Sequence, residues 1–262
     1  MSAGVTYPQS ALLGALQGFT EFLPVSSSAH LALAPRFFAF PDPGLTFDVG
    51  LHLGTLLAVL LYYRTIWTKM LLGAARDPRG EEGRNLGLLA LATLPAVVAG
   101  LLFEKSAEEA FRDPRRIGVC LIAFSGVMYW AERSARQVAD WRDAGARVLL
   151  LVGAAQALAI MPGVSRSGAT ISAALLLGLK SPQAAELSFL MATPIVAGAA
   201  ILKLRHLSPA DVDGVFLAGI AASAATGFAA VGAFIRFLPK SGFKPYVVYR
   251  VGLGLAALFL AR

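Results

Sequence analysis

Long apolar runs recur along almost the entire chain and constrain its fold more than any other feature. Six of them lie at approximately 47–63, 86–103, 117–131, 187–202, 214–235 and 245–261. The hydrocarbon core of a bilayer is about 30 Å thick and needs about 20 helical residues to cross it. The chain is 56% hydrophobic and 15% charged, whereas soluble proteins carry roughly 25% charged residues. We therefore expect an all-α polytopic membrane protein with about six transmembrane helices, forming a single integral membrane domain over 1–262.

Two further apolar stretches, 8–40 and 147–180, are interrupted in the middle by Pro, Gly and Ser. Glu21 and His30 fall within the first interruption, and Arg166 falls within the second. Irregular backbone at membrane depth is tolerated only where protein buries it or water reaches it. We therefore predict that both stretches are re-entrant helix–loop–helix segments.

The two interrupted stretches also resemble each other at a constant offset of 139 residues. Identical residues occur at the pairs Gly14 and Gly153, Gln17 and Gln156, Val25 and Val164, Ser26 and Ser165, and Ser28 and Ser167. Three apolar runs follow each stretch, so a second copy must be inverted in the membrane. We predict an inverted repeat of about 8–131 and about 147–262, with a site where the repeats meet. The alternative is two unrelated helix breaks of similar composition.

Basic residues are concentrated in the short segments between apolar runs. The segments 64–85, 131–147 and 236–246 contain twelve Lys and Arg, and the opposite set contains seven. The larger set is expected on the cytoplasmic side, so the first interrupted stretch faces outward. The net charge of +7 then reflects contact with membrane lipids, and no recognisable module indicates nucleic-acid binding. The N-terminus lacks a signal-peptide pattern, so we expect the first apolar run to be retained.

The first interruption carries the sequence QGFTEFLPVSSSAH, from Gln17 to His30. Gln17 and Glu21 share a helix face, and their oxygens are ligands suited to Mg²⁺ or Ca²⁺. Hydroxyl groups follow at Ser26 and Ser27, in a loop whose backbone N–H groups could receive an anion. The alternative is a Ser-rich helix cap with a carboxylate at the membrane interface.

The second interruption carries the sequence PGVSRSGAT, from Pro162 to Thr170. A Gly-rich turn that leads into a helix gathers N–H donors where a phosphate binds, and the guanidinium of Arg166 matches phosphate oxygens. The alternative is an interfacial Arg that pairs with lipid phosphate. A metal site, a hydroxyl beside a titratable group and an anion cradle together suit phosphoryl transfer on a substrate with a lipid tail.

These two motifs resemble those of the undecaprenyl-diphosphate phosphatase family associated with bacitracin resistance. The similarity extends along essentially the whole chain, including Phe47 to Leu57 and Glu186 to Pro194. The resemblance implies hydrolysis of undecaprenyl diphosphate to undecaprenyl phosphate and inorganic phosphate, with a divalent metal. It also implies recycling of the lipid carrier for peptidoglycan synthesis, bacitracin resistance, and a place in the bacterial inner membrane. The charges of the loops put the active site on the periplasmic side of that membrane. The oligomeric state is left open, with a homodimer as one option.

Matching positions assign the site residues. The resemblance gives catalytic roles to Glu21, Ser27, His30 and Arg166, phosphate binding to Ser26, Ser165, Ser167 and Thr170, and metal binding to Glu21 and Gln17. Many family members have Glu at the position of Gln17, so this chain offers a single carboxylate there. We favour Ser27 as the nucleophile and His30 as its general base or as the acid for the leaving group. Attack by His30 or by a metal-bound water is the alternative.

Three titratable side chains lie outside these motifs. We expect His52 to pack between helices, with an approach to the site from the side as the alternative. We expect Glu186 either to pair with Arg166 or Lys180 or to sit as a helix N-terminal charge. We expect His206 to be solvated in a polar loop and 104–116 to be an interfacial connector.

Two other functions compete with the phosphatase. Inverted repeats with broken helices are a transporter architecture, so a transporter or flippase of a polyprenyl phosphate carrier is the main alternative. A phosphatidate-type phosphatase is disfavoured, because the His expected downstream of Ser165 and Arg166 is missing.

Overall fold

The computed structural model describes residues 4–110, 113–204 and 212–261, and within these ranges the chain forms eleven α-helices and no β-strand. The all-α class is thereby confirmed. The helices are α1 (Tyr7–Phe22), α2 (Ser27–Phe37), α3 (Leu45–Tyr62), α4 (Arg64–Arg76), α5 (Glu81–Ala110), α6 (Pro114–Ser134), α7 (Ala146–Ala157), α8 (Arg166–Leu176), α9 (Ser181–Leu204), α10 (Gly214–Ser241) and α11 (Lys244–Leu260).

Both interrupted stretches fold as a helix, a turn and a second helix, and both breaks have the same local cause. Leu23 and Met161 are extended because each precedes a proline, which disfavours helical backbone at the residue before it. The following helices, α2 and α8, begin after Ser26 and Ser165, whose φ angles are 73° and 74°. Positive φ is uncommon for residues other than glycine. Two serines at matching positions therefore share an unusual backbone, as expected of a repeat.

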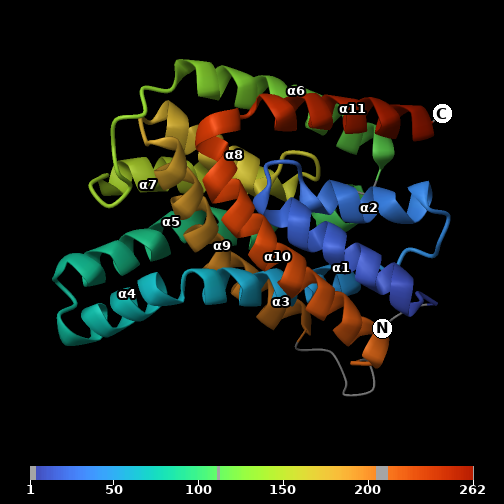
Figure 1. Ribbon diagram of the computed structural model, residues 1–262, viewed down its shortest axis with the longest axis horizontal. Coiled ribbons are helices and arrows are strands. Elements are labelled where there is room, and N and C mark those ends of the chain that lie inside the picture. Colours follow the sequence, from blue (N-terminus) through green and yellow to red (C-terminus); the bar gives the residue numbers. More distant parts are fainter. Residues whose placement is uncertain (1–3, 111–112, 205–211, 262) are drawn as a thin grey trace.

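The two segments point in opposite directions. In Figure 1, α1 and α2 extend toward the end of the molecule labelled N and C, whereas α7 and α8 extend toward the other end. Their turns meet between these ends, where Gly163 N donates to Ser26 Oγ at 3.0 Å. This arrangement is the one that an inverted repeat requires. The exact repeat boundaries stay a prediction.

All six predicted spans fold as helices: α3, α5, α6, α9, α10 and α11. Of the helices in the described ranges, four are long and apolar enough to cross a membrane, over Leu45–Tyr62, Glu81–Phe103, Ser181–Leu202 and Gly214–Ser241. The remaining two, α6 and α11, pack along each other and lie side by side in Figure 1. Length and composition therefore support a polytopic membrane protein.

Small residues bring the interrupted helices close to a long helix of the other half. A methyl group on Gly14 of α1 would clash with the carbonyl oxygen of Gly219 in α10, and one on Gly153 of α7 would clash with that of Ala92 in α5. Small residues permit such close backbone approach between membrane helices. Each half therefore holds the interrupted segment of the other, and the two turns are fixed between them.

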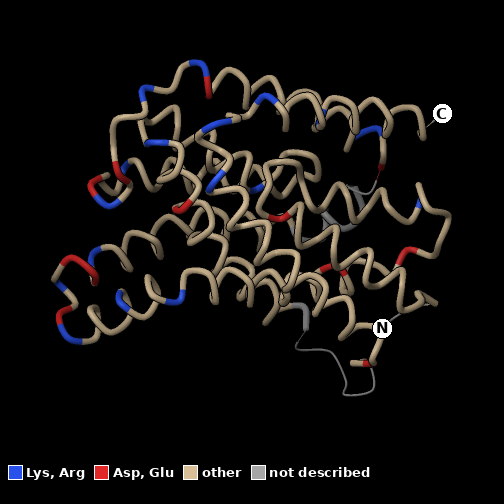
Figure 2. Tube along the Cα trace, in the orientation of Figure 1, with Lys and Arg blue, Asp and Glu red and all other residues tan. Residues whose placement is uncertain are grey.

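One end of the bundle carries most of the connections rich in charge. The segment 64–85, expected as a loop, contains α4, which forms a hairpin with the start of α5 and is joined to it by a Lys69–Glu82 ion pair of 2.6 Å. Figure 2 shows charged residues gathered at this end, near the α4–α5 hairpin and the α6–α7 connection. At the opposite end, the predicted connector 104–116 is instead helical up to Ala110. His206 lies outside the described residues.

Candidate active site

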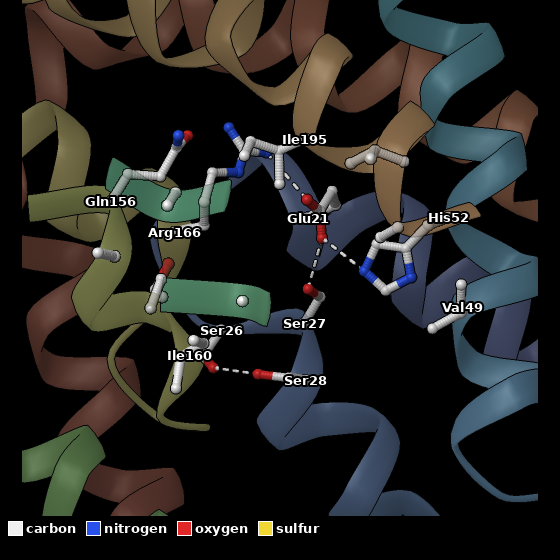
Figure 3. A pocket seen from close by; sticks show the side chains of 17 residues that line it. Glu21, Ser26, Ser27, Ser28, Val49, His52, Gln156, Ile160, Arg166 and Ile195 are labelled. Carbon is white, nitrogen blue, oxygen red and sulfur yellow. Dashed lines mark hydrogen bonds and ion pairs between the residues drawn. The ribbon is translucent and has the colours of Figure 1, made fainter. Parts of the chain in front are cut away.

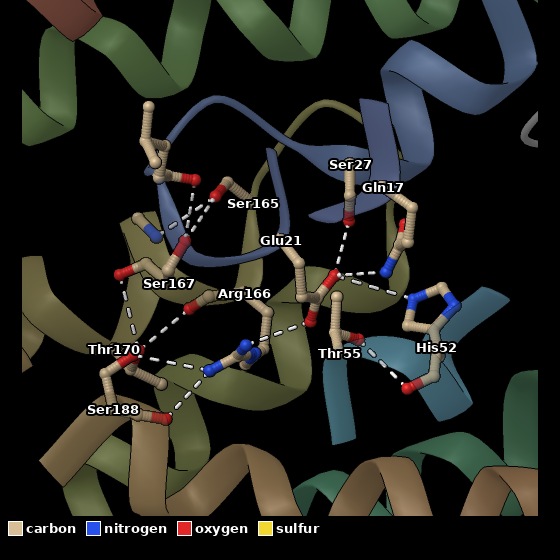
Figure 4. A network of polar contacts seen from close by, with 12 residues as sticks. Gln17, Glu21, Ser27, His52, Thr55, Ser165, Arg166, Ser167, Thr170 and Ser188 are labelled. Carbon is tan, nitrogen blue, oxygen red and sulfur yellow. Dashed lines mark hydrogen bonds and ion pairs between the residues drawn. The ribbon is translucent and has the colours of Figure 1, made fainter. Parts of the chain in front are cut away.

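Glu21, in the last turn of α1, lies at the centre of a polar network that joins the two halves (Figure 4). Its Oε1 accepts a hydrogen bond from Arg166 Nη2 at 2.9 Å. Its Oε2 accepts from Ser27 Oγ at 2.6 Å and from Gln17 Nε2 at 3.1 Å. The structure therefore brings together four of the side chains that the sequence assigns to the site.

Arg166 begins α8 and is held from two directions. Besides its ion pair with Glu21, its Nη1 donates to the backbone carbonyl of Ser188 in α9 at 2.8 Å. Thr170 Oγ1 donates to the carbonyl of Arg166 at 2.8 Å and lies 2.6 Å from Ser188 Oγ, whose hydroxyl can donate to it. A carboxylate that is only 7% exposed needs a counter-charge, and Arg166 supplies it within the protein.

The serines expected to bind phosphate also fix the two turns. Ser165 Oγ caps α8 by accepting from Gly168 N at 3.1 Å. Ser167 Oγ donates to the carbonyl of Leu23 at 3.0 Å, which ties the second turn to the first. Ser26 and Ser165 line the pocket beside Arg166, whereas Ser167 makes the tie between turns. Phosphate binding by these hydroxyls stays a prediction.

His30 forms its hydrogen bonds with residues other than Ser27. Its Nδ1 lies 2.7 Å from the carbonyl oxygen of Ser26, and its Nε2 lies 2.7 Å from the hydroxyl of Tyr249 in α11. Because a carbonyl only accepts, Nδ1 carries the proton and Nε2 accepts from Tyr249. Both ring nitrogens are occupied, so this arrangement does not offer His30 as the base for Ser27. The carboxylate of Glu21 takes that position instead.

His52 belongs to the site, so the favoured expectation of helix packing was wrong and the alternative, an approach to the site from the side, is confirmed. Its Nε2 lies 3.5 Å from Glu21 Oε2, and its ring lines the pocket. Its Nδ1 lies 2.8 Å from the carbonyl of Asp48 and so carries a proton. The sequence signal was present, because an ionisable side chain within an apolar span is a functional candidate.

Arg250 is the residue that the sequence analysis missed. It lies in α11, is fully buried, and donates to the carbonyls of Gly163 at 2.5 Å and Pro24 at 3.1 Å. A third bond, of 3.2 Å, reaches Ser125 Oγ in α6. One guanidinium thus holds the turns of both halves. An Arg within the apolar run 245–261 should have drawn the same attention as Arg166.

Glu186 is paired outside the site. Its Oε1 accepts from Arg142 Nη2 at 2.6 Å and from Trp141 Nε1 at 2.9 Å. Of the two alternatives for Glu186, pairing with Arg166 or Lys180 was wrong, because the α6–α7 connection packs against the N-terminal part of α9.

A cavity of about 260 Å³ lies beside the network. In Figure 3 the side chains of Glu21, Ser27, His52 and Arg166 gather around it. Its other walls are small or apolar residues of α3, α5, the end of α7 with the turn that follows, and α9: Val49, Ala96, Gly100, Ala157, Ala159, Ile160, Ile195, Val196 and Ala199. The pocket therefore combines a charged floor with apolar walls, as a lipid with an anionic head would need.

The candidate metal ligands, Gln17 and Glu21, are too few to hold a cation by themselves. Gln17 Oε1 is buried and has no hydrogen-bond partner among the described residues, and it lies on the same helix face as Glu21. Within the same ranges, no group of three or more His, Cys, Asp or Glu could hold a metal ion. Mg²⁺ commonly keeps several waters and is held by one or two protein ligands together with substrate phosphates. Gln17 and Glu21 would be the protein ligands of such an ion, but Gln17 does not line the pocket and both oxygens of Glu21 accept hydrogen bonds from the protein. The metal site stays a prediction.

The fold and the site together define an integral membrane protein with a buried polar centre between two halves, built around the Glu21–Arg166 ion pair. Comparison with known proteins agrees: the chain belongs to the family of the bacitracin resistance protein BacA, whose family model matches residues 10–256. The family expected from the two motifs is thereby confirmed.

Relatives match over nearly their full length. The undecaprenyl-diphosphatase of Elusimicrobium minutum is 44% identical over 259 residues, covering 98% of this chain and 99% of the relative. That of Moorella thermoacetica is 44% identical over 257 residues, covering 98% of each. That of Geobacter sulfurreducens is 44% identical over 260 residues, covering 95% of this chain and 96% of the relative.

Proposed function

We propose that this protein is an undecaprenyl-diphosphatase, which hydrolyses undecaprenyl diphosphate to undecaprenyl phosphate and inorganic phosphate. The observation that carries the proposal is the contact of Ser27, Glu21 and Arg166 across the two halves, at the floor of an apolar-walled pocket. A hydroxyl, a carboxylate and a guanidinium within hydrogen-bond reach are the groups that phosphoryl transfer requires. The names and full-length coverage of the relatives support the same reaction.

In the proposed reaction Ser27 is the nucleophile and Glu21 is its base. The Ser27 proton passes to Glu21 Oε2, 2.6 Å away, while Oγ bonds to the terminal phosphorus. The bond from that phosphorus to the bridging oxygen breaks, and undecaprenyl phosphate leaves. Water then attacks the phosphoserine and leaves with the phosphorus as inorganic phosphate, while Glu21 returns its proton to Ser27 Oγ and becomes a carboxylate again. In the competing mechanism water attacks the diphosphate directly, and no phosphoserine forms.

Arg166 stabilises charge on the transferred group in this scheme. The guanidinium faces Glu21 in the structure, and phosphate oxygens would replace one carboxylate oxygen as its partner. Its planar fork matches phosphate geometry, and a preorganised donor of this kind lowers the barrier because charge develops where it already points.

The proposal includes a divalent cation, Mg²⁺ or Ca²⁺, held by Glu21, Gln17 and the phosphates of the substrate. When bound, such an ion supplies positive charge that neutralises the diphosphate. The free amide oxygen of Gln17 supports this role. The protein supplies only two ligands, so the ion should bind weakly until the substrate is bound.

We place the protein in the bacterial inner membrane with the pocket facing the periplasm. The pocket is lined by the first half of α3, the middle of α5 and the last part of α9, and the start of α3 lies toward the end labelled N and C in Figure 1. The opposite end carries the loops with more basic residues, expected on the cytoplasmic side. Single cysteines at Arg79 and Asp113, in a Cys120→Ser background, test this orientation. An impermeant thiol reagent should label only the second in intact cells, and equal labelling contradicts the orientation.

The deciding experiment is phosphate release by the purified protein from undecaprenyl diphosphate in detergent, with and without chelator. Release that the chelator abolishes supports both the reaction and the metal. Release that the chelator leaves unchanged refutes the metal, and no release refutes the reaction.

A second candidate function, transport of a polyprenyl phosphate carrier, is favoured by the opposed interrupted segments, which are an architecture of transporters. Detergent removes the two sides that transport needs, so phosphate release there separates the two functions. By contributing undecaprenyl phosphate, the reaction would recycle the carrier for peptidoglycan synthesis and confer bacitracin resistance. Bacitracin sensitivity of cells with and without the Ser27→Ala protein tests that step.

A further inference from the structure

Gln156, in the last turn of α7, is a buried polar side chain whose amide is left without a partner. The residue is 2% exposed, and in the described part of the chain neither its Oε1 nor its Nε2 has a hydrogen-bond partner. A buried amide that stays unpaired is destabilising, and each such group in a native protein calls for an explanation. A ligand that completes these bonds would provide one.

Comparison with the first half shows why the amide is free. Gln17 occupies the matching position in α1, and its Nε2 donates to Glu21, four residues later, at 3.1 Å. In the second half the residue four positions after Gln156 is Ile160. Gln156 therefore has no carboxylate to orient, and its amide is available for another purpose.

The position of Gln156 indicates what that purpose is. It lines the same cavity as Ser165 and Arg166, and Figure 3 shows its amide on the side of the cavity where the guanidinium of Arg166 lies. An amide offers two N–H donors, and donors beside a fixed cation suit an anion with several oxygens. Phosphate has that chemistry.

We propose that Gln156 is a phosphate-binding residue, whose Nε2 donates to a non-bridging oxygen of the phosphate that Arg166 neutralises. The identification of that phosphate as part of a lipid diphosphate rests on the proposed function. Rotation about the last side-chain torsion, which is soft in Gln, turns the amide toward the ligand. A bond made equally to the bound substrate and to the transition state lowers KM and leaves kcat unchanged.

Gln156→Leu tests the proposal, because it removes the amide and keeps an apolar side chain of similar size. We expect KM for undecaprenyl diphosphate to rise about tenfold, as for a lost hydrogen bond to a charged group, with kcat little changed. The thermal unfolding temperature of the protein without ligand should equal or exceed that of the wild type, since an unpaired amide is gone. Gln156→Glu should raise KM further, because its carboxylate would repel the phosphate. An unchanged KM in folded Gln156→Leu overturns the proposal.

Ser172→Ala is the matched control. Its hydroxyl in α8 is also buried and without a partner among the described residues, yet Ser172 does not line this cavity. Its removal should leave KM as in the wild type, and an equal rise in KM in this control would show that the effect at Gln156 is not specific to the pocket.

A measurement without turnover separates this proposal from the proposed function. Inorganic phosphate and pyrophosphate should each raise the unfolding temperature of the wild type in detergent, because they bind only the folded state. The shift should be much smaller in Gln156→Leu. An equal shift in both proteins, or none in the wild type, overturns the role of Gln156 even if undecaprenyl diphosphate is hydrolysed. Failure to hydrolyse that lipid refutes the proposed function alone.

Discussion

Replacing Arg250 by Met should loosen both turns of the site at once. The change keeps a long apolar side chain in α11 but removes the donors to the carbonyls of Gly163, at 2.5 Å, and Pro24, at 3.1 Å. Each buried acceptor left without a partner costs about 1–3 kcal/mol. The loss of both should therefore destabilise the folded protein by about 2–6 kcal/mol.

Activity should fall by more than the folded fraction explains. The two turns carry Ser27 and Arg166 to Glu21, and a misplacement of about 1 Å can lower a rate by about 10²-fold. Arg250→Lys should recover little, because one ammonium group lacks the spread of the guanidinium fork.

Thermal unfolding in detergent and phosphate release per folded molecule are the two assays. Arg133→Met is the matched control, since Arg133 is exposed on α6 and its side chain bonds Tyr129 of the same helix at 3.2 Å. We expect this control to behave as the wild type in both assays. If Arg250→Met also unfolds and turns over as the wild type does, the reasoning that assigns both turns to this residue is wrong.

Three further sets of substitutions test the site and the pocket. Arg166→Ala should reduce phosphate release about 10²-fold or more and Arg166→Lys should restore little of it, so wild-type turnover in the Lys variant would contradict the role of the fork. Glu21→Gln should abolish activity, whereas Gln17→Glu should stay active and need less Mg²⁺ for half-maximal rate, as titration of both variants with the ion will show. Gly100→Leu points into open space and lines the pocket, so it should raise KM for the C55 substrate more than for a short-chain diphosphate. Gly87→Leu, on the same helix and also with open space around it, should leave KM for both substrates unchanged. Equal effects of the two changes on KM would contradict a role of the apolar walls in substrate binding.

The residues that are close in sequence could be assigned before the structure was known. Apolar runs predict helices in a membrane because the bilayer leaves few other ways to satisfy the backbone, and those runs fold as helices. The proline after Leu23 ends α1, and the proline after Met161 ends the short 3₁₀ helix Leu158–Ile160 that continues α7, through a steric effect on the preceding residue. Gln17 and Glu21 share a face because they are four residues apart, and the structure shows their bond.

Partners from distant segments were decided by tertiary packing. Sequence reasoning paired Ser27 with His30, three residues away, but the packing of α11 places Tyr249 against His30 and leaves Glu21 beside Ser27. The packing of α3 against α1 brings His52 to the same carboxylate. Periodicity describes only one helix at a time and carries no information on which helices become neighbours. For this reason the residue types of the site were readable from the sequence, whereas the contacts between those residues depended on the arrangement of the whole bundle.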